Sequence, residues 1–142
     1  MYYVDTRQIE DKLRFIPRIA AVCRHLQQIW TPGDDALGFA QERALQLAIE
    51  TVTDVGSLMI DGFLMRDAGS YEDIIEILHG EGVFSRDLAE PLVELVMLRK
   101  PLVRDYVEFD RRRLHPMIER LPDLLDDFAQ SVRAYLSKES AL

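Results

Sequence analysis

The chain has 142 residues and a formal net charge of −8, from 17 basic and 25 acidic side chains. Such a length can bury about two thirds of the unfolded surface in one core, so that no disulfide or metal is needed for the fold. The acidic balance excludes a general nucleic-acid coat protein, whose binding domain would be strongly basic.

A first helix is predicted from Asp5 or Thr6 to about Trp30, because apolar residues recur at helical spacing and either polar residue can cap its start. Pro17 should kink or break this helix. Cys23 has no partner cysteine and lies on the apolar face, which predicts a buried thiol in a reducing compartment. The charged start of the chain does not fit a signal peptide, and no apolar run reaches the length of a membrane span. We therefore expect a cytoplasmic protein with no membrane contact.

A second helix is predicted from about Leu37 to Met65. Its apolar residues cover a wide arc, which is typical of a central helix that packs on more than one side. After a turn, Ser70 and Asp73 resemble a capping arrangement for a short helix that ends near residues 79–80.

A fourth helix is predicted after Ser85, which should cap it. Apolar residues continue at i, i+3, i+4 and i+7 spacing far along this segment, with one arginine among them. The stripe consists of Leu92, Leu95, Val96, Arg99, Leu102, Val103 and Tyr106. A last helix should run from about Pro116 to Ser137. Because no segment shows strand alternation, we expect an all-α, up-and-down bundle of four long helices plus one short helix, forming a single domain over residues 1–142.

Arg99 is the most informative residue of that stripe. A guanidinium keeps its charge and is almost never fully buried alone, so it needs a carboxylate partner, an opening to solvent or an anionic ligand. Asp54 interrupts an apolar stripe of the central helix in the same way. Two readings follow: a buried structural ion pair between Asp54 and Arg99, or an Asp54 that orients Arg99 toward a cleft.

The basic residues gather around Arg99. Six of the 17 fall within fifteen positions: Arg99, Lys100, Arg104, Arg111, Arg112 and Arg113. Such a local cationic strip can meet phosphates although the whole protein is acidic.

Other chemical signatures are missing from the sequence. The histidines His25, His79 and His115 have no second ligand at i+3 or i+4, so we expect no metal site. No glycine-rich phosphate loop is present, and we expect no cofactor.

The segment from Arg99 to Tyr106 resembles the R-x4-H-x-Y motif of HepT-like toxins, a branch of the all-helical HEPN superfamily. The similarity extends upstream through residues 61–63 and 65–71 and through the leucine-rich helix after Ser85. This resemblance implies a HEPN-like fold and a homodimer whose two motifs face one cleft. It also implies metal-independent RNA cleavage and a nucleotidyltransferase antitoxin that can attach AMP to the motif tyrosine.

Carried over by position, Arg99 is the motif arginine, which would stabilise charge on a phosphorane-like transition state. Tyr106 is the motif tyrosine and the AMP acceptor, and on a continuous helix it would share a face with Arg99. Arg104 stands where the motif has histidine, and Lys100 where asparagine is common. Since arginine cannot accept a proton, we expect ribonuclease activity to be weak or lost, by a factor of about 10²–10⁴. Pro101 should bend the helix at this point.

Three functional hypotheses follow. In the first, Arg99, Lys100 and Arg104 bind RNA or a nucleotide without efficient cleavage. In the second, the protein is an active ribonuclease that uses Tyr106 or His115 as its acid–base group. In the third, it is a helical protein–protein interaction module in which Arg99 pairs internally with Asp54.

Overall fold

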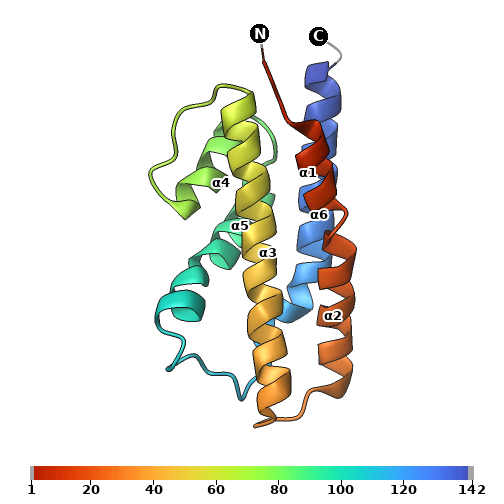
Figure 1. Cartoon of the computed structure of the whole chain (residues 1–142), viewed down its shortest axis with the longest axis vertical. Coiled ribbons are helices and arrows are strands. Elements are labelled where there is room, and N and C mark those ends of the chain that lie inside the picture. The colour runs from red at the N-terminus through yellow and green to blue at the C-terminus, as the bar shows by residue number, and fades with distance from the viewer. Residues whose placement is uncertain (1, 141–142) are drawn as a thin grey trace.

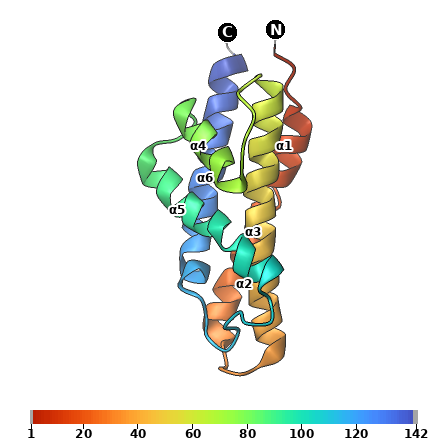
Figure 2. The same ribbon diagram turned by 90° about the vertical axis from the view of Figure 1, so that its left-hand side faces the viewer.

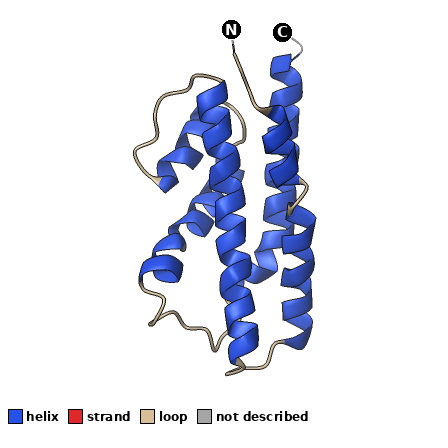
Figure 3. Cartoon of the chain, in the orientation of Figure 1, coloured by secondary structure: helices blue, strands red, loops and turns tan. Residues whose placement is uncertain are grey.

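The computed structural model describes residues 2–140. Within this range the chain is all helical and contains no strand, as Figure 3 shows, so the all-α prediction is confirmed. The elements are α1 (Thr6–Leu13), α2 (Ile16–Ile29), α3 (Asp35–Gly62), α4 (Tyr71–Gly80), α5 (Arg86–Met97), the π-helical turn η1 (Lys100–Arg104) and α6 (Pro116–Ser140). The first residue and the last two residues of the predicted 1–142 domain lie outside the described part.

The long helix α3 runs through the middle of the molecule (Figure 1). On one side α1 and α2 follow each other downward beside α6, and α2 packs against both α3 and α6. On the other side lie α4 and α5, which pack against each other, and Figure 2 views the molecule from that side. The start of α1 and the end of α6 lie at the same end of the bundle.

The predicted first helix is broken in two, as Pro17 indicated. The regular helical hydrogen-bond pattern is interrupted at Arg14 and Phe15, although both keep helical backbone angles. Pro17 lies in the first turn of α2, where its missing N–H costs no helical hydrogen bond. Buried apolar side chains from α1 to α6 join one core, and Cys23 is among them. Cys23 is fully buried, which confirms the predicted packed thiol. This burial raises the pKa of the Cys23 thiol to about 11.

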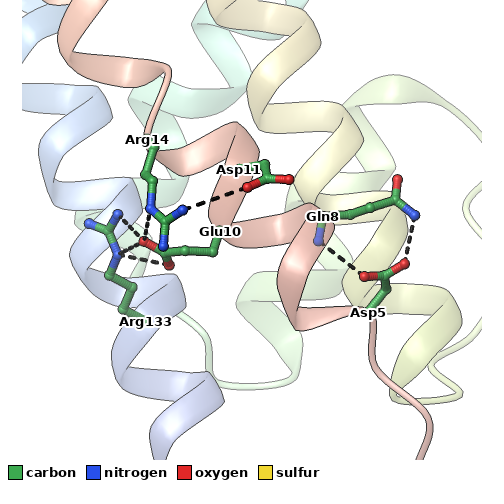
Figure 4. A network of polar contacts seen from close by, with 6 residues as sticks. All are labelled: Asp5, Gln8, Glu10, Asp11, Arg14 and Arg133. Carbon is green, nitrogen blue, oxygen red and sulfur yellow. Dashed lines mark hydrogen bonds and ion pairs between the residues drawn. The ribbon is translucent and has the colours of Figure 1, made fainter.

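The short helix α1 is attached to α6 by charge (Figure 4). Arg133 of α6 donates to Glu10 at 2.8 Å, and Arg14 lies 3.7 Å from the same carboxylate. The hydrogen bonds from Arg133 hold the pKa of Glu10 below its usual value. Asp5 caps α1 by accepting the backbone N–H of Gln8 at 3.0 Å.

Among residues 2–140, no helix is both long and apolar enough to cross a membrane.

Candidate functional site

The α4–α5 hairpin brings the start of one helix next to the end of the other. Tyr71 is the first residue of α4, and Arg99 lies just beyond the end of α5. The guanidinium carbon of Arg99 lies 4.2 Å from the centroid of the Tyr71 ring. Within residues 2–140, no carboxylate lies at ion-pair distance from the half-buried Arg99. The charge is therefore accommodated by the face of an aromatic ring, an arrangement that sequence spacing did not indicate.

Pro101 changes the helix that carries Arg99. It has no N–H to donate to the carbonyl of Met97, and α5 ends at that residue. The backbone then forms the wider turn η1, which is closed by a hydrogen bond of 3.1 Å from Asp105 N–H to the carbonyl of Lys100. The α-helix is thus interrupted close to Pro101, where a bend was expected, and it does not continue to Tyr106.

Two more cations lie on η1 itself. Lys100 and Arg104 are exposed, and in the described part of the chain neither has a carboxylate at ion-pair distance. Together with Arg99 they form what we call the η1 cations: Arg99, Lys100 and Arg104. These three positive charges lie within six positions of the chain and, among residues 2–140, have no acidic partner, which makes them a candidate binding site for an anion.

Tyr106 lies in a turn after η1, so the spacing argument that placed it on the face of Arg99 does not apply. Its side chain is 59 % exposed. Its carbonyl accepts a short hydrogen bond from the guanidinium of Arg111. Arg111 in turn donates to both oxygens of Glu42 on α3, at 2.7 and 3.0 Å, and these bonds raise its pKa. The turn that carries Tyr106 is thus fixed to α3, and its ring is left accessible.

Gln41 fixes the end of the loop that joins η1 to α6. The side chain of Gln41 is fully buried; its amide donates to the carbonyl of Arg113 at 3.0 Å, and its oxygen accepts the N–H of His115 at 2.6 Å. His115 caps α6, since its Nδ1 accepts the N–H of Met117 at 3.0 Å. Burial lowers the pKa of His115. With Nδ1 used as a cap, His115 serves the fold and is a poor candidate for the acid–base group.

Asp54 does not occupy the predicted position. Its side chain is 55 % exposed and forms an ion pair of 3.6 Å with Lys12 of α1. Within this chain the predicted pairing with Arg99 is therefore wrong, and so is a role for Asp54 as the orienting carboxylate in the same chain. Sequence did contain the relevant signal: Asp54 follows Glu50 by four residues and precedes Asp61 by seven, and all three are exposed on one polar stripe of α3.

Comparison with known proteins identifies the family. A family profile described as Ribonuclease HepT-like matches residues 13–132. The chain belongs to the HepT-like family of the HEPN superfamily. It is 38 % identical over 140 residues to YutE of Bacillus subtilis (strain 168), a protein named as a candidate RNase, and the match covers 98 % of this chain and 94 % of YutE.

Solved structures agree with this family assignment. That of Bacillus subtilis YutE, described as a cytosolic protein, superposes with a TM-score of 0.86 at 36 % identity and covers 98 % of this chain and 95 % of the other. A tri-AMPylated Shewanella oneidensis HEPN toxin in complex with an MNT antitoxin superposes with a TM-score of 0.74. That match covers 89 % of this chain and 96 % of the other at 18 % identity, and it shows a shared HEPN fold.

Proposed function

We propose that this HepT-like protein is a cytosolic dimer that binds RNA or a nucleotide through the η1 cations and cleaves RNA weakly or not at all. The observation that carries this proposal is the set of three neighbouring cations, Arg99, Lys100 and Arg104, none of which has an acidic partner among residues 2–140. Phosphate oxygens would supply the missing negative charge, and arginine binds them through two parallel N–H donors.

The chemistry of position 104 limits the reaction. Cleavage of RNA by its own 2′-hydroxyl needs a group that takes up a proton and a group that returns one. The motif histidine is replaced by arginine at position 104, and an arginine side chain in a protein does not accept a proton. Arg104 therefore strengthens the binding of phosphate and contributes no proton transfer.

Exposed apolar side chains beside the η1 cations support the dimer. Met97, Val103 and Val107 are exposed around η1, Val107 to 74 %. Apolar side chains that gather beside a charged site commonly mark an interface. We expect Val107→Glu to shift the protein toward the monomer in sedimentation velocity experiments, while Val22→Glu on α2 leaves the dimer intact.

An antitoxin partner is supported by the structural neighbours, one of which is an AMPylated HEPN toxin in complex with its antitoxin. We propose that a nucleotidyltransferase binds this protein and transfers AMP from ATP to the hydroxyl oxygen of Tyr106, with release of pyrophosphate and of the hydroxyl proton. The Tyr106 ring is accessible on a fixed turn. After co-expression with a nucleotidyltransferase, mass spectrometry should find AMP on Tyr106. Tyr106→Phe should remove the modification, and retention of AMP in that variant would contradict this assignment.

RNA binding is tested by fluorescence anisotropy with a labelled single-stranded RNA over a series of salt concentrations. We expect the triple variant Arg99→Ala, Lys100→Ala, Arg104→Ala to bind more weakly, with a salt slope that is smaller by about 0.7 for each lost phosphate contact. The matched control is Arg7→Ala, Arg18→Ala, Arg24→Ala, which removes the same charge from exposed positions on α1 and α2. Equal affinity of the two triple variants would contradict the proposal.

A further inference from the structure

The contact between Arg99 and Tyr71 joins two helices at the candidate phosphate site. Arg99 follows α5 and Tyr71 begins α4, and the guanidinium lies over the ring at 4.2 Å from its centroid. This distance is well within the range of about 6 Å over which the negative face of an aromatic ring attracts a cation.

Stacking and ion pairing use different parts of a guanidinium. A carboxylate binds the N–H donors at the edge of the plane, whereas a ring covers the flat face and leaves those donors free. Because Arg99 has no carboxylate partner within residues 2–140, its edge is open to a ligand. A ring therefore fixes the direction of the side chain without competing with phosphate.

The same protein contains a contrasting arginine. Arg111 lies over the ring of Phe39, at 5.6 Å from the centroid, but its Nε and Nη2 donate to Glu42 and to the carbonyl of Tyr106. Arg111 is thus a structural residue that is both stacked and ion-paired. Arg99 is also stacked on a ring, but within residues 2–140 its N–H donors have no carboxylate partner. This is the state expected of an arginine that binds an anionic ligand.

The backbone at the start of α4, which carries Tyr71, is fixed by several hydrogen bonds of the neighbouring residues. Ser70 caps the helix by accepting the N–H of Asp73 at 3.1 Å. Asp73 accepts two hydrogen bonds from Arg66, at 2.6 and 2.7 Å, and the N–H of Gly69 at 3.0 Å. A ring on a backbone fixed in this way can fix a neighbouring cation.

We infer that Tyr71 is a positioning residue, whose ring face holds the Arg99 guanidinium with its N–H donors free to bind a phosphate group of RNA or a nucleotide. This inference rests on the proposed function for its ligand, while the ring contact can be tested without any ligand. Only the ring face is required, so the hydroxyl of Tyr71 has no part in the role.

The ring contact is tested by NMR on the full chain. Ring currents should shift the Arg99 Nε–Hε resonance upfield in the wild type, in Tyr71→Phe and in Tyr71→Trp. The shift should be lost in Tyr71→Leu, where Arg99 keeps its charge. If the wild-type resonance shows no such shift, or if Tyr71→Leu leaves it unchanged, the positioning role is overturned.

The ligand role is tested by anisotropy with labelled single-stranded RNA. Tyr71→Leu should weaken binding by about two- to fivefold, the range expected for one exposed cation–π contact. Tyr71→Phe should bind like the wild type, and so should Phe39→Leu, the matched control at the engaged arginine. Equal binding by Tyr71→Leu and the wild type, or a loss in Tyr71→Phe as large as in Tyr71→Leu, would overturn the inference. If Arg99→Ala binds RNA like the wild type, the proposed function itself fails, whatever the NMR shift shows.

Discussion

The guanidinium of Arg99 rests on the ring of Tyr71, 28 positions earlier in the chain, and not against Asp54. This contact leaves a positive charge at the surface with its hydrogen-bond donors free. An Arg99 with free donors can bind phosphate, whereas an Arg99 neutralised by a carboxylate of the bundle could not. The contact with Tyr71 also takes the place of the Asp54–Arg99 ion pair on which the interaction-module hypothesis depended.

The turn that carries Tyr106 should depend on Arg111. Arg111→Gln removes the two bonds to Glu42 and weakens the bond to the Tyr106 carbonyl, so the turn should open more often. We expect chymotrypsin to cleave after Tyr106 severalfold faster in this variant. Arg113→Gln is the control, because the Arg113 side chain is highly exposed and its one ion pair within residues 2–140 is with Asp110 at 3.8 Å. Equal cleavage rates in the two variants would contradict this role of Arg111.

Gln41 should be essential for stability. Gln41→Leu leaves the carbonyl of Arg113 and the N–H of His115 without their partner, and each such loss costs about 1–3 kcal/mol. We expect the free energy of unfolding to fall by about 2–4 kcal/mol in urea denaturation. Gln46→Leu, at a half-buried position of the same helix, should change it by less than about 1 kcal/mol. Similar losses of unfolding free energy in both variants would show that the two hydrogen bonds of Gln41 have no special role.

Gly56 sets the close approach of α3 to α4. A Cβ at Gly56 would collide with the side chain of Ile74, whereas a Cβ at Gly80, the last residue of α4, would meet nothing within 4 Å. Gly56→Ala should therefore destabilise the protein by about 1–3 kcal/mol through overpacking. Gly80→Ala should stabilise it by up to about 1 kcal/mol, because glycine is the poorer helix former. Thermal unfolding measures the stability of both variants. A Gly56→Ala variant as stable as the wild type would contradict the close packing of α3 against α4 at this position.

The start of α4 should weaken in acid. Hydrogen bonds from Arg66 and from Gly69 N–H lower the pKa of Asp73 from 3.8 to about 2. Because the folded pKa lies below the unfolded one, the contribution of Asp73 is complete above about pH 4 and is lost as the pH falls toward 2. Asp73→Asn should remove this part of the pH dependence between pH 4 and 2, as measured by urea denaturation. If the free energy of unfolding of the variant falls between pH 4 and 2 as much as that of the wild type, Asp73 does not cause this loss of stability.

Local patterns predicted the fold well because they act over short distances. Helical periodicity, the Ser70 cap and the break near Pro17 were all readable, and the structure confirms each. Ser85 occupies the cap position of α5 as predicted, although within the described residues its hydroxyl makes no capping bond. The boundaries of α3 differ by only two or three residues from those predicted.

The candidate site was less predictable because its geometry depends on contacts between distant segments. An α-helix turns by about 100° per residue, but near Pro101 the π-helical turn η1 replaces the α-helix. The position of Tyr106 relative to Arg99 could therefore not be predicted from their spacing in the sequence. The role of Tyr71 depends on how the α4–α5 hairpin packs. No local pattern contains that information.

The most direct test is metal-independent cleavage of a structured RNA in the presence of EDTA, by the wild type and by Arg104→His. Histidine at position 104 restores a group that titrates near neutrality, so we expect a rate about 10²–10⁴ times that of the wild type. Arg104→Gln is the control, since it removes the charge and adds no proton transfer. Wild-type cleavage as fast as that of Arg104→His would contradict the account, and its loss in Tyr106→Phe would then identify Tyr106 as the acid–base group.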